Sequence, residues 1–126
     1  MGSYHLLLVE DTIMLAELVM ETLQHIHDVD CKHVATGISA IEYLENNRPD
    51  LILLDLNLPG KSGWQVMEFL NEHYGKGAVK VVVMTAQGDS ANRLVGKLQD
   101  VERYMIKPIA PRDMIDAICE ILQIDM

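Results

Sequence analysis

The stretch LILLDLNLPG, residues 51–60, decides the fold. Its first four residues, Leu51 to Leu54, are all apolar, which is typical of a strand that is buried on both faces. An aspartate, Asp55, follows at once, and Pro59 and Gly60 end the segment. The sequence therefore raises the question of what a carboxylate does at the end of the most buried strand.

Outward from this stretch, short β-forming runs alternate with segments of helical length. The four other predicted strands are Tyr4–Val9, Cys31–Ala35, Val79–Met84 and Glu102–Ile106. Apolar residues at helical spacing predict a first helix over 12–27 with Leu15, Leu18, Val19, Leu23 and Ile26 on one face. Further helices are marked by Ile38, Ile41 and Leu44; by Val66, Phe69 and Leu70; by Leu94, Val95 and Leu98; and, from Pro111 on, by Ile115, Ile118, Cys119 and Leu122.

This alternation predicts an α/β fold of five βα units. Strands that are apolar throughout and joined by helices form a doubly wound parallel sheet with helices on both faces. The 126 residues fit one domain over 1–126, with no linker or repeat that would divide it. No apolar run approaches the roughly 20 residues of a membrane helix, and no signal peptide is visible.

The formal net charge of −9 disfavours direct contact with nucleic acid, because such contact needs a basic face. Cys31 and Cys119 lie in apolar settings far apart in the sequence. We interpret them as buried thiols of a reduced, cytoplasmic protein rather than as a disulfide.

Polar side chains stand at the ends of four predicted strands. Glu10 and Asp11 follow the first strand, Asp55 the third, Thr85 the fourth and Lys107 the fifth. Ligands of a doubly wound sheet bind at this carboxyl edge. Two like charges about 4 Å apart repel by roughly 4 kcal/mol at an effective dielectric near 20. Lys107 offsets only part of that repulsion, and an all-oxygen site open to water and phosphate favours Mg2+ as the second cation.

The same residues suit phosphoryl chemistry. Asp55 is a candidate nucleophile that would become an aspartyl phosphate. Lys107 would place a positive charge near the phosphoryl oxygens, and Thr85 would donate a hydrogen bond to one of them. Taken singly, Asp55 is also typical of a turn, and Glu10 with Asp11 of a helix cap. Their common place at one edge of the sheet favours the joint interpretation.

Four blocks resemble the signature of the receiver domain of two-component response regulators: LLLVED (6–11), LILLDLNLPGKSGWQV (51–66), VVVMTA (81–86) and YMIKP (104–108). Their order and spacing fit along essentially the whole chain. The resemblance implies the chemotaxis-type, flavodoxin-like fold with strand order 2-1-3-4-5. It also implies a phosphorylation-activated switch of a phosphorelay, with Asp55 as phosphoacceptor and Mg2+ held by Glu10, Asp11, Asp55 and the backbone carbonyl of Asn57.

The resemblance further implies switch residues Thr85 and Tyr104, the family's lysine at Lys107 and a cis peptide at Lys107-Pro108. The expected phosphoryl donor is a histidine kinase or a histidine phosphotransfer protein. The expected output surface is formed by the fourth helix, the fifth strand and the fifth helix, where Gln99-Asp100-Val101 departs from the family's small residues. The resemblance also implies that the chain is not an enzyme beyond its own phosphorylation and dephosphorylation.

Two alternative functions fit these residues less well. An aspartate-nucleophile phosphohydrolase needs a second Asp two residues after the nucleophile, where this chain has Asn57. A flavodoxin-like redox carrier needs a Ser-, Thr- and Gly-rich loop after the first strand, whereas Glu10 and Asp11 would repel the FMN phosphate. The histidines share no ligand spacing, and we interpret all of them as structural or solvated: His5, His25, His27, His33 and His73.

Overall fold

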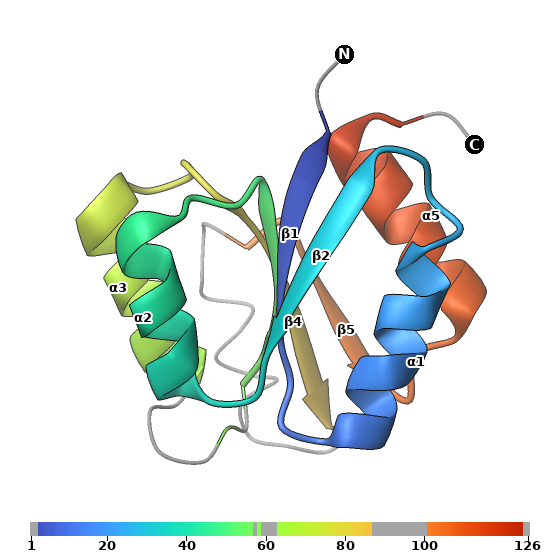
Figure 1. The fold of residues 1–126 in the computed structure, drawn as a ribbon, viewed down its shortest axis with the longest axis horizontal. Helices are drawn as coiled ribbons and strands as arrows, with labels where there is room; N and C mark the ends of the chain where they lie inside the picture. The colour runs from blue at the N-terminus through green and yellow to red at the C-terminus, as the bar shows by residue number, and fades with distance from the viewer. Residues whose placement is uncertain (1–2, 57, 59–62, 87–100, 125–126) are drawn as a thin grey trace.

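The computed structural model describes residues 3–56, 58, 63–86 and 101–124. A sheet of five parallel strands in the order β2-β1-β3-β4-β5 forms the middle layer. Helices α2 and α3 cover one face of the sheet, and α1 and α5 cover the other (Figure 1). The predicted doubly wound sheet and its strand order are confirmed. The predicted fourth helix lies outside the described residues.

The bounds of the elements agree closely with the sequence pattern. The strands are β1 (Tyr4–Val9), β2 (Val29–Val34), β3 (Leu51–Asp55), β4 (Lys80–Ala86) and β5 (Arg103–Lys107). The described helices are α1 (Ile13–Leu23), α2 (Gly37–Asn46), α3 (Gly63–Tyr74) and α5 (Pro111–Leu122). None of these helices has the length and apolar character needed to span a membrane.

Strand β3 is the centre of the sheet, and all of its residues are buried. Leu51 and Leu53 belong to the core beneath α1 and α5. Ile52 and Leu54 belong to the core beneath α2 and α3. Since successive side chains of a strand point to opposite faces, a strand covered on both faces needs apolar residues throughout. This is why the stretch shows no alternation of apolar and polar residues.

Helix α1 differs from its prediction in length and in its buried face. It ends at Leu23 rather than near residue 27, although Ile26 beyond it is still buried. The side chain of Leu18 is 46% exposed. The helix turns Ala16 and Leu23 onto the sheet, so Leu18 lies on its flank beside a hollow that separates α1 from α5. In α2, likewise, Ile38 is exposed while Leu44 is buried.

Both cysteines are free thiols, as expected, and both are half-buried. Burial raises the pKa of the Cys31 thiol to about 12, against a weaker lowering by its hydrogen bond with the backbone of Leu8. Because the thiolate is the reactive form, Cys31 is a packing residue in this fold.

Helix α3 begins against the backbone that carries Asp55. A Cβ atom added to Gly63 would lie 2.7 Å from the carbonyl oxygen of Asp55 and 2.7 Å from the Cα of Leu56. Both of these atoms belong to the backbone, so neither can rotate away. The absence of a side chain at Gly63 therefore fixes how closely α3 approaches the end of β3.

We predict that Gly63→Ala lowers the free energy of unfolding by about 2 kcal/mol, because overpacking against backbone forces the helix and strand apart. Chemical denaturation followed by circular dichroism measures this change. Glu68→Ala, at an exposed position of the same helix, is the matched control and should change stability by less than about 0.5 kcal/mol. Equal stabilities of the two variants would contradict the close approach.

Candidate functional site

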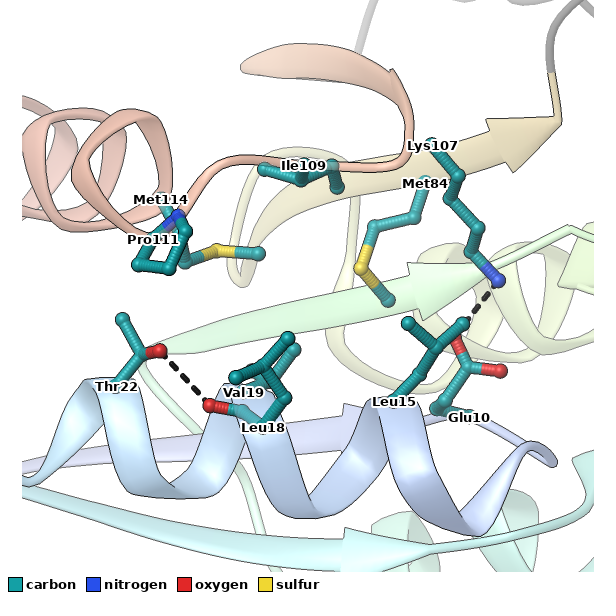
Figure 2. Close-up of a pocket in the computed structure, with 10 residues that line it drawn as sticks. All are labelled: Glu10, Leu15, Leu18, Val19, Thr22, Met84, Lys107, Ile109, Pro111 and Met114. Carbon is teal, nitrogen blue, oxygen red and sulfur yellow. Dashed lines mark hydrogen bonds and ion pairs between the residues drawn. The ribbon is translucent and has the colours of Figure 1, made fainter.

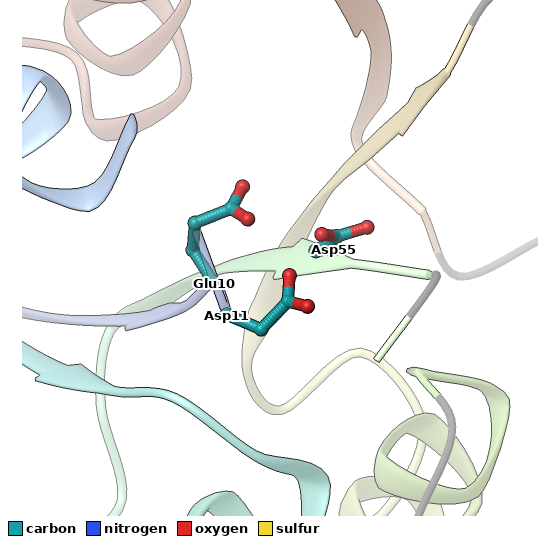
Figure 3. A group of neighbouring side chains, drawn as sticks. All are labelled: Glu10, Asp11 and Asp55. Carbon is teal, nitrogen blue, oxygen red and sulfur yellow. The ribbon is translucent and has the colours of Figure 1, made fainter. Parts of the chain in front are cut away.

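Three carboxylates meet at the carboxyl edge of the sheet. In the parallel register Val9 lies beside Leu54, so the next residues along the two strands, Glu10 and Asp55, are neighbours. Together with Asp11 they offer oxygen atoms that all lie within 4.8 Å of one another (Figure 3). Glu10 and Asp55 are buried, and Asp11 is exposed. The structure thus brings together the three acidic side chains that the sequence places at this edge.

Lys107 joins two of these carboxylates. Its ammonium Nζ lies 2.7 Å from Oε1 of Glu10 and 2.9 Å from Oδ2 of Asp55. The lysine ends strand β5, and its side chain reaches across β4 to the acidic group. The carboxylates are 2% and 3% exposed and the lysine side chain is 21% exposed, so water screens these ion pairs weakly. The following peptide, Lys107-Pro108, is cis, as expected from the resemblance.

Burial and the ion pairs shift the pKa values of both Glu10 and Lys107 from their ordinary values. Burial raises the pKa of the Glu10 carboxyl, and it outweighs the lowering by the hydrogen bonds from Lys107 and from the backbone of Thr12. Burial alone would lower the pKa of Lys107. The hydrogen bonds to Glu10 and Asp55, with the negative charges of these two groups, together outweigh burial and raise the pKa above its ordinary value. Lys107 therefore remains an ammonium while Glu10 is pushed toward its neutral form. Further positive charge at this edge would relieve both effects.

The backbone around Glu10 is held at several points. The Glu10 N–H donates to the carbonyl of Val34 at 3.1 Å, and the Thr12 N–H donates to Oε2 of Glu10 at 3.1 Å. Nε2 of His33 lies 2.8 Å from the carbonyl oxygen of Glu10. Thr12, rather than Glu10 or Asp11, is the N-cap residue of α1. The interpretation of the acidic pair as a simple helix cap is therefore wrong.

Sequence reasoning missed the contact of His33. The partner of this histidine is the backbone carbonyl of Glu10, just beyond the end of the neighbouring strand, and such a partner leaves no spacing signal in the sequence. Only the strand register, which places His33 beside Leu8, reveals that the ring can reach the end of β1.

Thr85 lies in β4, between the strands that carry Asp55 and Lys107. Its side chain is fully buried, and Oγ1 has no hydrogen-bond partner among the residues that the structure describes. A buried hydroxyl without a partner costs about 1–3 kcal/mol. The Thr85 hydroxyl is thus available to donate a hydrogen bond at the edge of the sheet where the carboxylates lie.

Of the two other predicted site residues, the structure describes only Tyr104, which stands apart from the carboxylates. The Tyr104 side chain is 47% exposed and stands on β5, paired in register with Val83. Asn57, the expected carbonyl ligand, lies outside the described residues.

A small hollow borders the cluster on the side of α1 and α5. It has a volume of about 30 Å³, and Glu10 and Lys107 lie at one end of it (Figure 2). Its other walls are mostly apolar, among them Leu15, Met84 and Met114. A space of this size holds about one water molecule. The hollow therefore shields one side of the ion pairs and does not admit an organic substrate.

Residues 6–119 match the family model described as the response regulator receiver domain. The DNA-binding response regulator MtrA of Mycobacterium tuberculosis (strain ATCC 25618 / H37Rv) is 32% identical over 110 residues, which are 87% of this chain and 46% of that protein. The phosphate regulon transcriptional regulatory protein PhoB of Escherichia coli (strain K12) is 31% identical over 118 residues, 94% and 51% of the two chains. The chain thus spans about half the length of these curated relatives.

Solved structures agree with the family match. A putative response regulator from Chloroflexus aurantiacus J-10-fl has a TM-score of 0.84 and 26% identity, covering 97% of this chain and 99% of that one. The signal receiver domain of a putative Luxo repressor protein from Vibrio parahaemolyticus has a TM-score of 0.75 and 31% identity, covering 98% and 99% of the two chains.

We predict that Lys107→Met lowers the free energy of unfolding in EDTA by roughly 2–3 kcal/mol, because it leaves two buried carboxylates without their cation. In millimolar Mg2+ the deficit relative to wild type should shrink by at least half, since a metal that binds only the folded state stabilises it. Denaturant titrations with and without Mg2+ measure both values.

Lys80→Met is the matched control, because Lys80 pairs with one half-exposed carboxylate at 3.8 Å. It should show a small loss that is independent of Mg2+. A deficit of Lys107→Met that is the same in EDTA and in Mg2+ would contradict the charge argument.

Proposed function

The chain belongs to the response regulator receiver domain family, and we propose that it accepts a phosphoryl group on Asp55 as the input of a signalling switch. The observation that carries this proposal is the position of Asp55 at the end of a buried strand, bonded to Lys107 and within 4.8 Å of two other carboxylates. A nucleophile needs a rigid support and precise neighbours, and the strand end supplies both.

Transfer of the phosphoryl group to Asp55 forms one bond to phosphorus and breaks another. A carboxylate oxygen of Asp55 attacks phosphorus, the new O–P bond forms, and the P–N bond to the imidazole of a phosphohistidine donor breaks. The donor's imidazole leaves and takes up a proton. Lys107, already 2.9 Å from Oδ2 of Asp55, then faces the added negative charge. We propose a histidine kinase or a histidine phosphotransfer protein as the physiological donor.

Mg2+ is the cation that we propose for the acidic cluster. The donors are carboxylate oxygens, which favour hard ions, and the raised pKa of Glu10 reflects burial that Lys107 does not fully offset. Glu10, Asp11 and Asp55 would hold the ion, with the carbonyl of Asn57 as the further ligand expected from the family. When bound, the ion supplies positive charge that neutralises phosphoryl oxygens.

Thr85 and Tyr104 are the proposed output switch. The Thr85 hydroxyl is buried without a partner among the described residues, so a phosphoryl oxygen on Asp55 would give it one. A hydrogen bond to a charged group is worth about 1.5–3 kcal/mol, enough to shift a two-state population by roughly ten- to a hundredfold. The Tyr104 ring is half exposed on the adjacent strand and would respond by turning inward. The surface around the fourth helix, β5 and α5 would then change for an output partner.

We propose no separate catalysed reaction for this chain. The phosphohydrolase alternative is disfavoured by the family and by Asn57, which stands where that class of enzyme has an acid. We further propose that residues 1–126 act as one receiver unit in the cytoplasm and make no direct contact with nucleic acid. The net charge of −9 supports the last point, although the relative MtrA is named as DNA-binding.

We predict Mg2+-dependent phosphorylation of Asp55. Acetyl phosphate is a small donor that needs no protein partner, so the intact mass should increase by one phosphoryl group when acetyl phosphate and Mg2+ are both present. Asp55→Asn should not gain this mass, and Asp50→Asn is the matched control at the opposite end of β3. Equal incorporation in excess EDTA would exclude the role of the metal.

Thr85→Ala should still accept phosphate but should lose most of the phosphorylation-induced NMR shifts near Tyr104. The substitution removes the donor hydroxyl while retaining a small apolar side chain at a fully buried position. Heteronuclear spectra before and after phosphorylation measure the shifts. If they persist at wild-type size, the signal does not pass through Thr85.

A further inference from the structure

We propose that His33 is a positioning residue of the cation site: its ring holds the peptide between Glu10 and Asp11 so that both carboxylates face Asp55. The inference rests on the cation site proposed above and goes beyond it. It adds a residue that lies on another strand and contributes no ligand atom. The observation behind it is the 2.8 Å contact between Nε2 of His33 and the carbonyl oxygen of Glu10.

The direction of this hydrogen bond is fixed by its partner. A carbonyl oxygen only accepts, so Nε2 of His33 must carry the proton and donate it. The neutral Nε2–H tautomer and the imidazolium both satisfy this requirement.

The ring is placed for this contact by the sheet and by α1. His33 belongs to the edge strand β2, beside Leu8 of β1, and its side chain is half-buried. It lines a hollow against α1 together with Ile13, Ala16 and Met20. From there the ring extends along β1 to Glu10, the first residue after the strand.

The held peptide is the last fixed point before Asp11. Glu10 has other restraints, namely the backbone of Val34 and Thr12 and the ammonium of Lys107. The Asp11 side chain is exposed, and among the described residues it makes no hydrogen bond or ion pair. The position of the Asp11 carboxylate therefore depends on the orientation of the peptide that precedes it, and His33 fixes the carbonyl of that peptide.

A positioning role differs from simple packing in its dependence on the donor. Gln can place its amide nitrogen near the position of Nε2 and donate the same hydrogen bond, whereas Met is of similar length and donates none. Packing alone would make the Met variant the better substitute. Positioning makes Gln the better one, and the difference should appear in cation affinity, since partners that orient ligands typically change metal affinity about 10- to 100-fold.

The test is Mn2+ binding followed by electron paramagnetic resonance of the free ion, with Mg2+ as competitor. Wild type, His33→Gln, His33→Met and His33→Ala are compared, with His27→Met as a control at an exposed histidine. We expect His33→Met and His33→Ala to bind both ions about tenfold more weakly. His33→Gln should remain within about twofold of wild type, and His27→Met should be unchanged. Thermal unfolding in EDTA checks that each variant is folded.

Each outcome decides between the claims. If wild type binds neither ion in the millimolar range, the proposed cation site fails and this inference fails with it. If wild type binds and the Met variant is equally tight, or if Gln and Met are equally weak, the cation site stands and the role of His33 is overturned. Should the Ala variant not fold, the Gln and Met pair still gives the answer.

Discussion

The structure depends on one interaction, the ammonium of Lys107 held between the carboxylates of Glu10 and Asp55. A parallel sheet directs the carboxyl ends of its strands to one edge, and here that edge collects three acidic side chains. One ammonium cannot balance them. The pKa of Glu10 is raised, chiefly by its burial, and the pKa of Lys107 is raised by its bonds to the two carboxylates. Lys107 thus holds two of the carboxylates together, and the cluster would favour additional positive charge, which is the condition for binding a divalent cation.

The rest of the fold makes this edge rigid. Strand β3 is apolar on both faces and fully buried, so Asp55 stands at the end of a strand that is packed on both sides. Gly63 brings α3 into contact with the backbone of Asp55, which restricts movement of the strand end. Thr85, by contrast, lacks a hydrogen bond that a buried hydroxyl requires, since its Oγ1 has no partner among the described residues. A phosphoryl oxygen on Asp55 would meet that requirement, so phosphorylation there would have a structural consequence beyond Asp55 itself.

The sequence predicts the sheet well because strand burial leaves a strong pattern. β1 has the predicted bounds, and β4 and β5 differ from their predictions by one or two residues at each end. The end of α1 was predicted too late because Ile26 is apolar and buried, although it lies in the turn before β2, where Asp28 has a φ of 64°. The start of β2 was predicted too late because Asp30 carries no strand signal, and its pairing with His5 on β1 defines it. Leu18 and Ile38 fit a helical stripe, yet both are exposed, because the helices bury other residues such as Ala16 and Ala40 against the sheet.

The candidate site, like the fold, could be predicted from the sequence only in part. Glu10, Asp11, Asp55 and Lys107 could be placed together because strand ends share an edge in any parallel sheet. His33 could not be placed there, since it acts on a backbone carbonyl and the sequence does not record the register. The roles of Asn57 and of the fourth helix remain predictions, because both lie outside the described residues.

The central claim is that the carboxylate at the end of β3 receives the phosphoryl group, and trapping the acyl phosphate tests it most directly. Sodium borohydride reduces an acyl phosphate to an alcohol, which converts a phosphorylated aspartate into homoserine. After incubation with acetyl phosphate and Mg2+, borohydride treatment and peptide sequencing by mass spectrometry, the account predicts homoserine at position 55 alone. Homoserine at position 11, or a stable phosphoryl group on a histidine with Asp55 intact, would contradict it.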